Sequence, residues 1–253
     1  MEHRIEGRRL GKHPYIHNPK HLQMARYVTD ALPVAPPSKS WTPKCRDPWT
    51  PMGNIDYGDC PYAAQGHAEQ VWTANDAGLE LTVTEQQVLD AYAVGTGFKP
   101  SDPQSDRGDT CAHALKMWQQ KGIGGRKIQA YVEIEPGNHE HVRQCVCLAG
   151  VCYIGLDLPV SAQSQKVWSV VKGSTGQAGS WGGHCVVVVA YSPYGLWVVS
   201  WGELYFMTWG FWNAYCDEGW LPVGNSWVGP DKRAPNGLLV DNIIADAQLL
   251  AEA

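Results

Sequence analysis

The chain has 253 residues, of which 44% are hydrophobic and 18% are charged, and its net charge is −5. A chain of this size can bury a substantial core as one large domain, with or without an extension. No apolar run reaches the roughly 18 residues of a membrane span, and the N-terminus lacks the apolar core of a secretory signal. A membrane partner is therefore not expected. The eight cysteines are expected to be mostly free thiols in a reducing compartment.

The charge is unevenly distributed along the chain. Residues 1–50 contain nine Lys or Arg and four Asp or Glu, a balance of +5, so that the remainder carries −10. A basic arm can bind nucleic acid or another anionic surface, but such arms more often wrap the acidic domain of their own chain or a partner subunit. We expect the latter, and nucleic acid remains a minor option that rests on charge alone.

Residues 31–52 are rich in proline and lack helical periodicity. This composition predicts an extended surface segment that forms no regular element. We therefore divide the chain into a basic, Pro-rich N-terminal arm, residues 1–51, and a single domain, residues 52–253.

The stretch Asp59-Cys60-Pro61 places a cysteine at the start of a predicted helix that runs to about Asn75. Proline suits the first helical position, which makes Cys60 the predicted N-cap. The positive end of the helix dipole and its unpaired N–H groups would then lower the pKa of the thiol. The alternative is a buried cysteine that happens to begin a helix, and the local sequence does not decide between them.

Further elements follow in chain order. Helices are predicted over 84–95, where Thr84 and Gln87 can form a capping box, and over 110–121. The second half changes to short β-branched or aromatic runs that predict strands over 151–158, 185–191 and 196–201, the last two joined as a hairpin. A helix over 138–147 and a terminal helix within 236–253 complete an α+β layout.

A cysteine nucleophile needs a base, and the base needs an orienting partner. His184 is the best candidate base, because it follows Gly182-Gly183 at the head of a predicted strand. The hairpin partner strand brings Ser200 alongside. We expect the Ser200 hydroxyl to accept the imidazole Nδ1–H and leave Nε2 facing Cys60.

This ordered pattern resembles the papain-like cysteine peptidase superfamily: a cysteine that begins a helix, then Gly-Gly-His at the head of a strand, then a polar residue before Trp-Gly. The resemblance covers about residues 52–223 and implies a papain-like fold, with a helical half packed on an antiparallel sheet. It also implies roles for four residues. Cys60 would be the nucleophile, His184 the general base and acid, Ser200 the orienting residue, and Asn54 an oxyanion donor.

Two of these positions differ from papain, which has Gln in place of Asn54 and Asn in place of Ser200. The wider pattern, Gly-Asn before Gly-Asp-Cys together with Trp-Gly-Gly-His, is most similar to small papain-fold proteins of bacteria and their phages. That likeness implies that the arm belongs to the mature protein and is not a removable propeptide. It also implies a location in the cytoplasm or in a phage particle.

Two hypotheses of function stay open. The first is a cysteine peptidase or amidase that acts on a protein, a peptide or the peptide of peptidoglycan. The second is a papain-fold structural or binding protein, such as a virion component, that joins an assembly through its arm. Under the first hypothesis, the substrate groove would include Trp181, Gly183 and Trp201, and no cofactor would be needed.

Two histidine and cysteine patterns have structural interpretations. His67 lies two helical turns from Cys60, roughly 10 Å away, which favours a core histidine bonded to backbone over a catalytic one. Cys145, Cys147 and Cys152 match no strong zinc spacing, so no metal site is expected.

Overall fold

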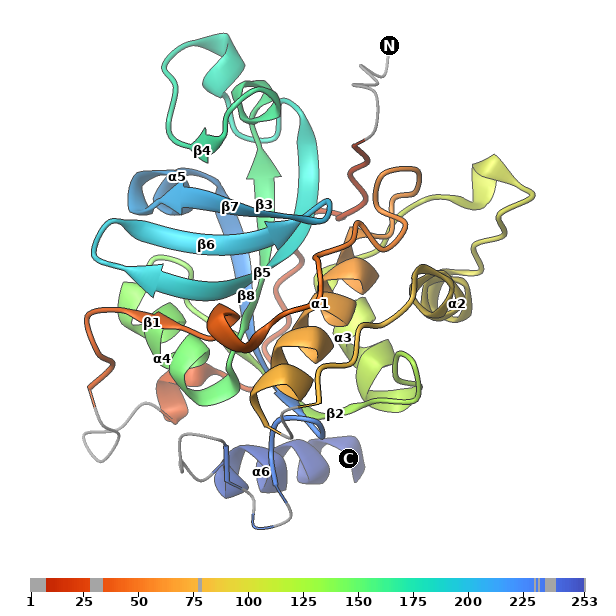
Figure 1. Ribbon diagram of the computed structural model, residues 1–253, viewed down its shortest axis with the longest axis vertical. Coiled ribbons are helices and arrows are strands. Elements are labelled where there is room, and N and C mark those ends of the chain that lie inside the picture. The colour runs from red at the N-terminus through yellow and green to blue at the C-terminus, as the bar shows by residue number, and fades with distance from the viewer. Residues whose placement is uncertain are drawn as a thin grey trace.

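The computed structural model describes residues 8–27, 34–76, 79–229, 231, 233–234 and 240–252. Three helices on one side face a large sheet on the other (Figure 1): α1 (Cys60–Asn75), α2 (Glu85–Thr96) and α3 (Cys111–Gln120). The order of helices first and sheet second confirms the predicted α+β layout. Helix α1 packs against the sheet at β5 (Gly182–Ser192), which brings the start of α1 toward the start of that strand.

The three predicted helices form within one residue of their expected bounds. Thr84 and Gln87 make both hydrogen bonds of the predicted capping box at α2. Helix α1 differs in one detail that bears on the site: its N-cap is Asp59, and Cys60 is its first helical residue. The N-cap prediction for Cys60 is therefore wrong by one position, and Pro61 stands one place further into the first turn, where a missing N–H still costs nothing.

The sheet runs in the order β2-β8-β3-β5-β6-β7-β4, and β1 pairs separately with β5. All pairs are antiparallel except β4 with β7. The predicted strands and the hairpin of β5 with β6 are present. The strands besides β5 are β1 (Lys39–Ser40), β2 (Ile128–Ile134), β3 (Cys152–Leu158), β4 (Val167–Trp168), β6 (Gly195–Ser200), β7 (Glu203–Thr208) and β8 (Cys216–Gly224).

Further helices surround the sheet. They are α4 (His139–Ala149), α5 (Trp209–Tyr215) and α6 (Asp241–Glu252), of which α4 and α6 were predicted. Short 3-10 turns lie at Met24–Arg26, Thr42–Lys44, Pro103–Ser105, Val160–Gln163 and Ser174–Gly176. Part of the predicted terminal helix, residues 236–239 and 253, lies outside the described residues.

The described part of the arm packs on the chain's own domain, as the charge balance predicted. Leu22, Met24 and Trp41 are buried, and the Trp41 indole donates to the Val146 carbonyl at 2.7 Å. The prediction that residues 31–52 form no element is wrong, because β1 extends the sheet there and a 3-10 turn follows it. A two-residue strand is too short for periodicity to reveal, and backbone pairing to β5 supplies its stability.

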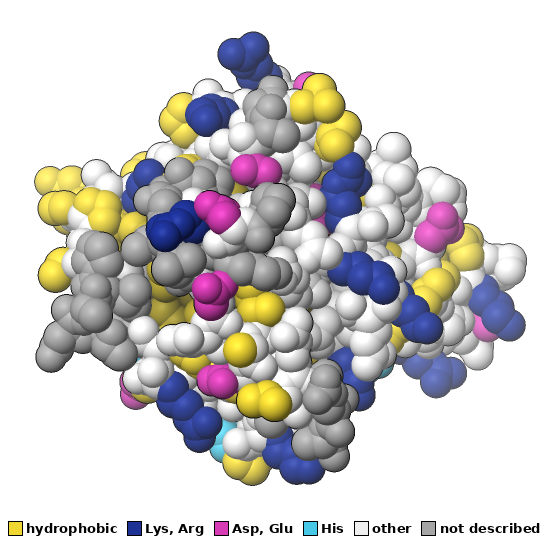
Figure 2. Space-filling view, turned by 90° about the horizontal axis from the view of Figure 1, so that it is seen from below, with side chains coloured by type: hydrophobic (Ala, Val, Ile, Leu, Met, Phe, Trp, Pro, Cys, Tyr) yellow, Lys and Arg dark blue, Asp and Glu magenta, His cyan; other side chains and the backbone are white. Residues whose placement is uncertain are grey.

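Three general properties of the structure concern its surface charge, its cysteines and the length of its apolar helices. On the face seen from below, Lys and Arg side chains are interspersed with acidic and uncharged ones (Figure 2). All eight cysteines are free thiols. No helix in the described part of the chain is both long and apolar enough to cross a membrane.

Candidate active site

His184 and Ser200 meet at the sheet, where the start of β5 lies beside the end of β6. The imidazole Nε2 and the Ser200 Oγ are 2.7 Å apart, and both residues are buried. The expected use of the ring nitrogens is therefore wrong: Nε2 bonds to the serine, and Nδ1 is buried with no hydrogen-bond partner in the described structure. The free nitrogen available for proton transfer is Nδ1.

Trp201 covers this hydrogen bond. Its indole stacks on the His184 ring, with centroids 4.3 Å apart and an interplanar angle of 9°. Trp201 has a positive φ of 47°, a left-handed conformation that costs a non-glycine residue of the order of 1 kcal/mol or more. The tight turn Trp201-Gly202 between β6 and β7 thus holds the ring over the imidazole, and fixes its plane.

Cys60 lies at the first turn of α1 and is 1% exposed. Burial, together with the neighbouring Cys185, raises the pKa of the Cys60 thiol, although backbone N–H groups of Cys185 and Gly11 favour the thiolate. The predicted lowering of this pKa is therefore wrong for this conformation, because the loss of water outweighs the helix terminus. Burial also lowers the pKa of His184 to about 3. The thiol and the imidazole are both neutral here.

Asn54 stands in the loop before α1 and is buried. Its side-chain amide donates to the Tyr57 carbonyl at 3.0 Å, inside its own loop. Asp59, fully buried next to Cys60, has a pKa well above its ordinary value because of burial. The oxyanion role of Asn54 stays a prediction.

A segment that was not predicted to reach the site crosses it. Residues 8–13, which we call the strap, pass between the helical half and the sheet (Figure 1). On the sheet side, the Lys12 N–H donates to the Gly183 carbonyl at 3.1 Å, and the Trp201 indole donates to the Arg9 carbonyl at 3.1 Å. On the other side, the Arg9 N–H donates to the Asn54 carbonyl at 3.1 Å. The strap thus bonds to both halves directly over Cys60 and His184.

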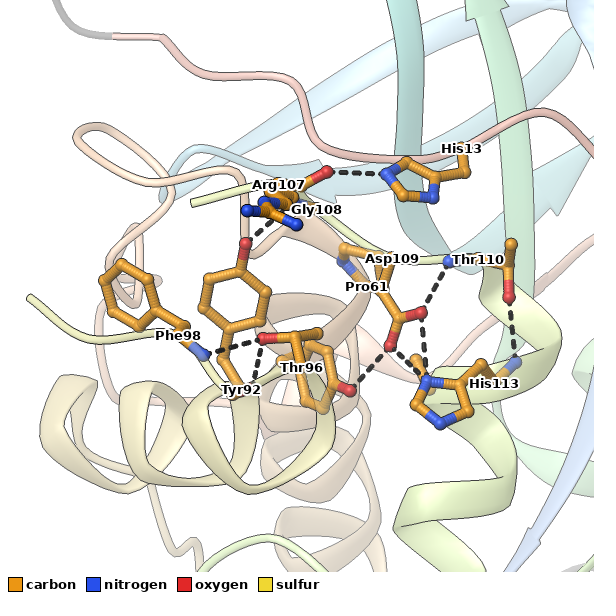
Figure 3. A network of polar contacts seen from close by, with 12 residues as sticks. His13, Pro61, Tyr92, Thr96, Phe98, Arg107, Gly108, Asp109, Thr110 and His113 are labelled. Carbon is orange, nitrogen blue, oxygen red and sulfur yellow. Dashed lines mark hydrogen bonds and ion pairs between the residues drawn. The ribbon is translucent and has the colours of Figure 1, made fainter. Parts of the chain in front are cut away.

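Asp109, in the loop before α3, holds the strap on the helical side. Its N–H donates to the Gly11 carbonyl and its carbonyl accepts the His13 N–H, both at 2.9 Å. Its carboxylate accepts the Tyr62 hydroxyl at 2.7 Å and lies 2.8 Å from the His113 Nδ1 (Figure 3). The His13 ring in turn contacts the Arg107 carbonyl of the same loop at 2.5 Å. These contacts stabilise the loop before α3, which is hydrogen-bonded to the strap.

Glycines set how closely the strap approaches. A Cβ on Gly11 would lie 1.8 Å from the Gly58 carbonyl oxygen, and one on Gly183 would lie 2.2 Å from the Lys12 carbonyl oxygen. Only glycine fits at these two contacts: Gly11, where the strap touches the helical half, and Gly183, where the sheet touches the strap. A cavity of about 390 Å³ remains beside the strap, lined by strap residues, Gly58, the 106–108 loop and 181–183.

His184 and Ser200 are hydrogen-bonded, and Cys60 contacts the backbone of Cys185, the residue that follows His184. The predicted groove residues Trp181, Gly183 and Trp201 surround the strap there. The strap and Asp109 were not predicted from the sequence. The sequence contains only coarse signals for them: a basic arm on an acidic body, and a glycine turn, Gly108-Asp109, before a helix.

The remaining candidates have structural roles. His67 contacts the Thr50 carbonyl at 2.8 Å, and burial lowers its pKa to about 4, which fits the predicted core histidine. The Cys145 thiol contacts the Val151 and Trp220 carbonyls. Within the described residues, no three His, Cys, Asp or Glu side chains gather as ligands for a metal ion.

Comparison with known proteins places this arrangement in a fold. No protein-family model and no curated protein matches the chain, but solved structures do. Xylellain, a cysteine protease from Xylella fastidiosa, is 15% identical with a TM-score of 0.54, covering 88% of this chain and 98% of its own. Digestive procathepsin L 3 of Tenebrio molitor is 15% identical with a TM-score of 0.57, covering 78% of this chain and 72% of its own.

A cysteine protease from Carica candamarcensis gives a similar result, with 17% identity, a TM-score of 0.55, and coverage of 74% of this chain and 98% of its own. The chain therefore has the papain-like fold of cysteine proteases, as its motifs predicted.

Proposed function

We propose that this protein is a papain-like cysteine hydrolase that cleaves amide bonds, with Cys60, His184 and Ser200 as its catalytic residues. The observation that carries the proposal is the orientation of the imidazole. Ser200 fixes Nε2, Trp201 fixes the ring plane, and Nδ1 is left free near the helix that begins at Cys60. A structural protein has no need of a buried imidazole with one unpaired nitrogen, which costs stability.

The proposed reaction follows acyl transfer to sulfur. The Cys60 proton passes to His184 Nδ1 as Sγ attacks the carbonyl carbon, and backbone N–H donors with Asn54 stabilise the oxyanion. Nδ1–H then protonates the leaving amine, which departs and leaves a thioester on Sγ. Water, deprotonated by Nδ1, hydrolyses the thioester and restores the thiol.

We infer that the conformation described is a closed form of this enzyme. The strap excludes water and substrate from Cys60, and the resulting burial raises the pKa of the thiol while it lowers that of His184. Reaction requires the strap to leave. In the open form, water returns and both pKa values move back toward their ordinary range.

Casein digestion and hydrolysis of purified peptidoglycan, each followed by mass spectrometry, test the activity and separate its two substrate classes. Cys60→Ala should abolish hydrolysis in either assay and remove labelling of this position by iodoacetamide. If Cys60→Ala hydrolyses substrate as fast as the wild type, the proposed nucleophile is wrong.

A structural or binding function remains a second candidate, and the Asn54 side chain favours it. That amide is bonded to Tyr57 in its own loop, where an active enzyme would direct it to the substrate. This candidate predicts stoichiometric incorporation into an assembly that Cys60→Ala leaves unchanged. Co-sedimentation of wild type and Cys60→Ala with the assembly distinguishes it from the hydrolase.

A further inference from the structure

The Lys12 side chain of the strap fills an acidic pocket next to the candidate active site. Its Nζ lies 2.5 Å from Asp217 Oδ2, 3.6 Å from Glu218 Oε1 and 3.7 Å from Asp157 Oδ1. The lysine side chain is completely buried. Burial opposes its charge, but Cys111, Asp217 and Glu218 outweigh burial and raise the pKa of Lys12, so the amine is charged.

The pocket is shaped for a long, thin, basic side chain. Gly155 of β3 forms its wall, where a Cβ would lie 2.2 Å from Lys12 Cε and 2.6 Å from Glu218 Cγ. The absence of a side chain at this position therefore makes room for the aliphatic stem. A basic side chain as long as that of Lys12 can therefore place its charged group beside Asp217 and Glu218 at the start of β8.

The pocket has more acceptors than Lys12 uses. Asp217 Oδ1 is buried and has no hydrogen-bond partner among the described residues. Glu218 Oε1 is buried and reaches Lys12 only as an ion pair at 3.6 Å, while the other Glu218 oxygen accepts the Trp220 indole at 2.8 Å. The Glu218 side chain is 1% exposed. Buried carboxylate oxygens that are not fully hydrogen-bonded favour a ligand with several donors, and a guanidinium has more donors than an amine.

The residue that fills the pocket is also bonded to the backbone beside the candidate base. The Lys12 N–H is bonded to the carbonyl of Gly183, the residue before His184. A peptide that displaces the strap and takes the same backbone bond would present a side chain to the same three carboxylates. We propose that this pocket is the specificity pocket of the enzyme and selects substrates with a lysine or arginine side chain beside the scissile bond. The proposal rests on the proposed hydrolase function for its catalytic consequence.

Substrate profiling tests it with the full chain carrying Lys12→Ala, which empties the pocket and leaves its carboxylates in place. Peptides of one sequence, with Lys, Arg or norleucine at each position in turn, are digested and the cleavage rates compared by mass spectrometry. The Lys and Arg peptides should be cleaved about tenfold faster than the norleucine peptide at one position, as expected for a charge-assisted bond. Rates that are equal for all three side chains overturn the proposal.

A matched control neutralises the pocket without changing its shape: Lys12→Ala combined with Asp217→Asn and Glu218→Gln. The ratio of Lys to norleucine rates should fall toward one in this variant. If this variant still cleaves the Lys and Arg peptides faster than the norleucine peptide, the basic side chain is recognised at another site. That result overturns the assignment of the pocket.

A binding measurement separates this proposal from the proposed function. The same peptides are titrated by calorimetry into Lys12→Ala protein that also carries Cys60→Ala. If no peptide is cleaved but Lys and Arg peptides bind about tenfold tighter than norleucine, and lose that advantage with Asp217→Asn and Glu218→Gln, the hydrolase proposal fails and the pocket assignment stands. Equal binding of all peptides overturns the pocket.

Discussion

Gly11→Ala should open the candidate active site. The new Cβ would lie 1.8 Å from the Gly58 carbonyl oxygen and 2.3 Å from its carbon, closer than the 3.0 Å that real Cβ atoms keep. Both obstacles are backbone atoms, which cannot rotate away. The strap must therefore retreat by about 1 Å or more at this point, which the close packing of the cleft does not permit without loss of contacts.

Two hydrogen bonds flank this contact: Asp109 N–H to the Gly11 carbonyl at 2.9 Å, and Lys12 N–H to the Gly183 carbonyl at 3.1 Å. At about 1 kcal/mol each, their loss shifts the equilibrium between closed and open forms by about 2 kcal/mol, or roughly 30-fold. When opening is fast relative to labelling, the labelling rate of Cys60 follows the open population. We expect iodoacetamide to label Cys60 about 30-fold faster in Gly11→Ala than in the wild type.

The measurement has internal and matched controls. Peptide mapping reports every cysteine, and buried Cys145 and Cys152 become labelled only if the whole fold opens. Gly137→Ala is the matched variant, since nothing lies within 4 Å of a Cβ at that position. A Cys60 labelling rate in Gly11→Ala equal to that of Gly137→Ala, or a parallel rise at Cys145, would refute the role assigned to the strap.

Three further predictions concern the catalytic residues and stability. Cys60→Ala in the Gly11→Ala background should remove hydrolysis, measured on casein and peptidoglycan, while the melting temperature stays close to that of its parent. Ser200→Ala should lower kcat about tenfold or more with a smaller change in KM, because Nε2 of His184 loses its partner; unchanged kcat would argue against an orienting role. Burial raises the pKa of Glu69 from 4.5 to about 7. Between these two pH values the folded state keeps a proton that the unfolded state releases. The unfolding free energy therefore falls by up to about 3 kcal/mol as the pH rises from 4.5 to about 7. Glu69→Gln should reduce that slope in urea titrations between pH 4.5 and 8, and an unchanged slope would contradict it.

The parts of the site that sequence predicted share a local signal. A proline just inside a helix fixes where α1 begins, and two glycines before His184 mark the head of a buried strand. These features act within a few residues of the chain, so the placement of Cys60 at a helix start and of Ser200 beside His184 followed from them. The choice of ring nitrogen did not, because the rotamer of His184 depends on the Trp201 ring that stacks on it.

The parts that sequence missed depend on contacts between distant segments. Strand β8 contains Gly219 and Pro222, which disfavour strands in isolation, and its pairing with β2 and β3 overrides that preference. Helix α5 is short and contains Gly210, with Thr208 as its N-cap. The sequence of the strap shows no helical or strand periodicity. Backbone hydrogen bonds to Gly183 and Asp109 hold it in the cleft, and no local sequence pattern predicts such bonds.

Closure of the strap and protonation of the site are thermodynamically linked. In the closed form burial lowers the pKa of His184 from 6.5 to about 3, so a proton binds the open form more readily, and the closed form loses stability as pH falls below about 6.5. Between pH 6.5 and 5 the opening equilibrium should rise about 16-fold. Hydrogen exchange of the strap peptide, corrected for its intrinsic pH dependence, measures this opening. In His184→Gln, which stays neutral, the loss of protection should be smaller; an equal loss would show that His184 does not cause the opening.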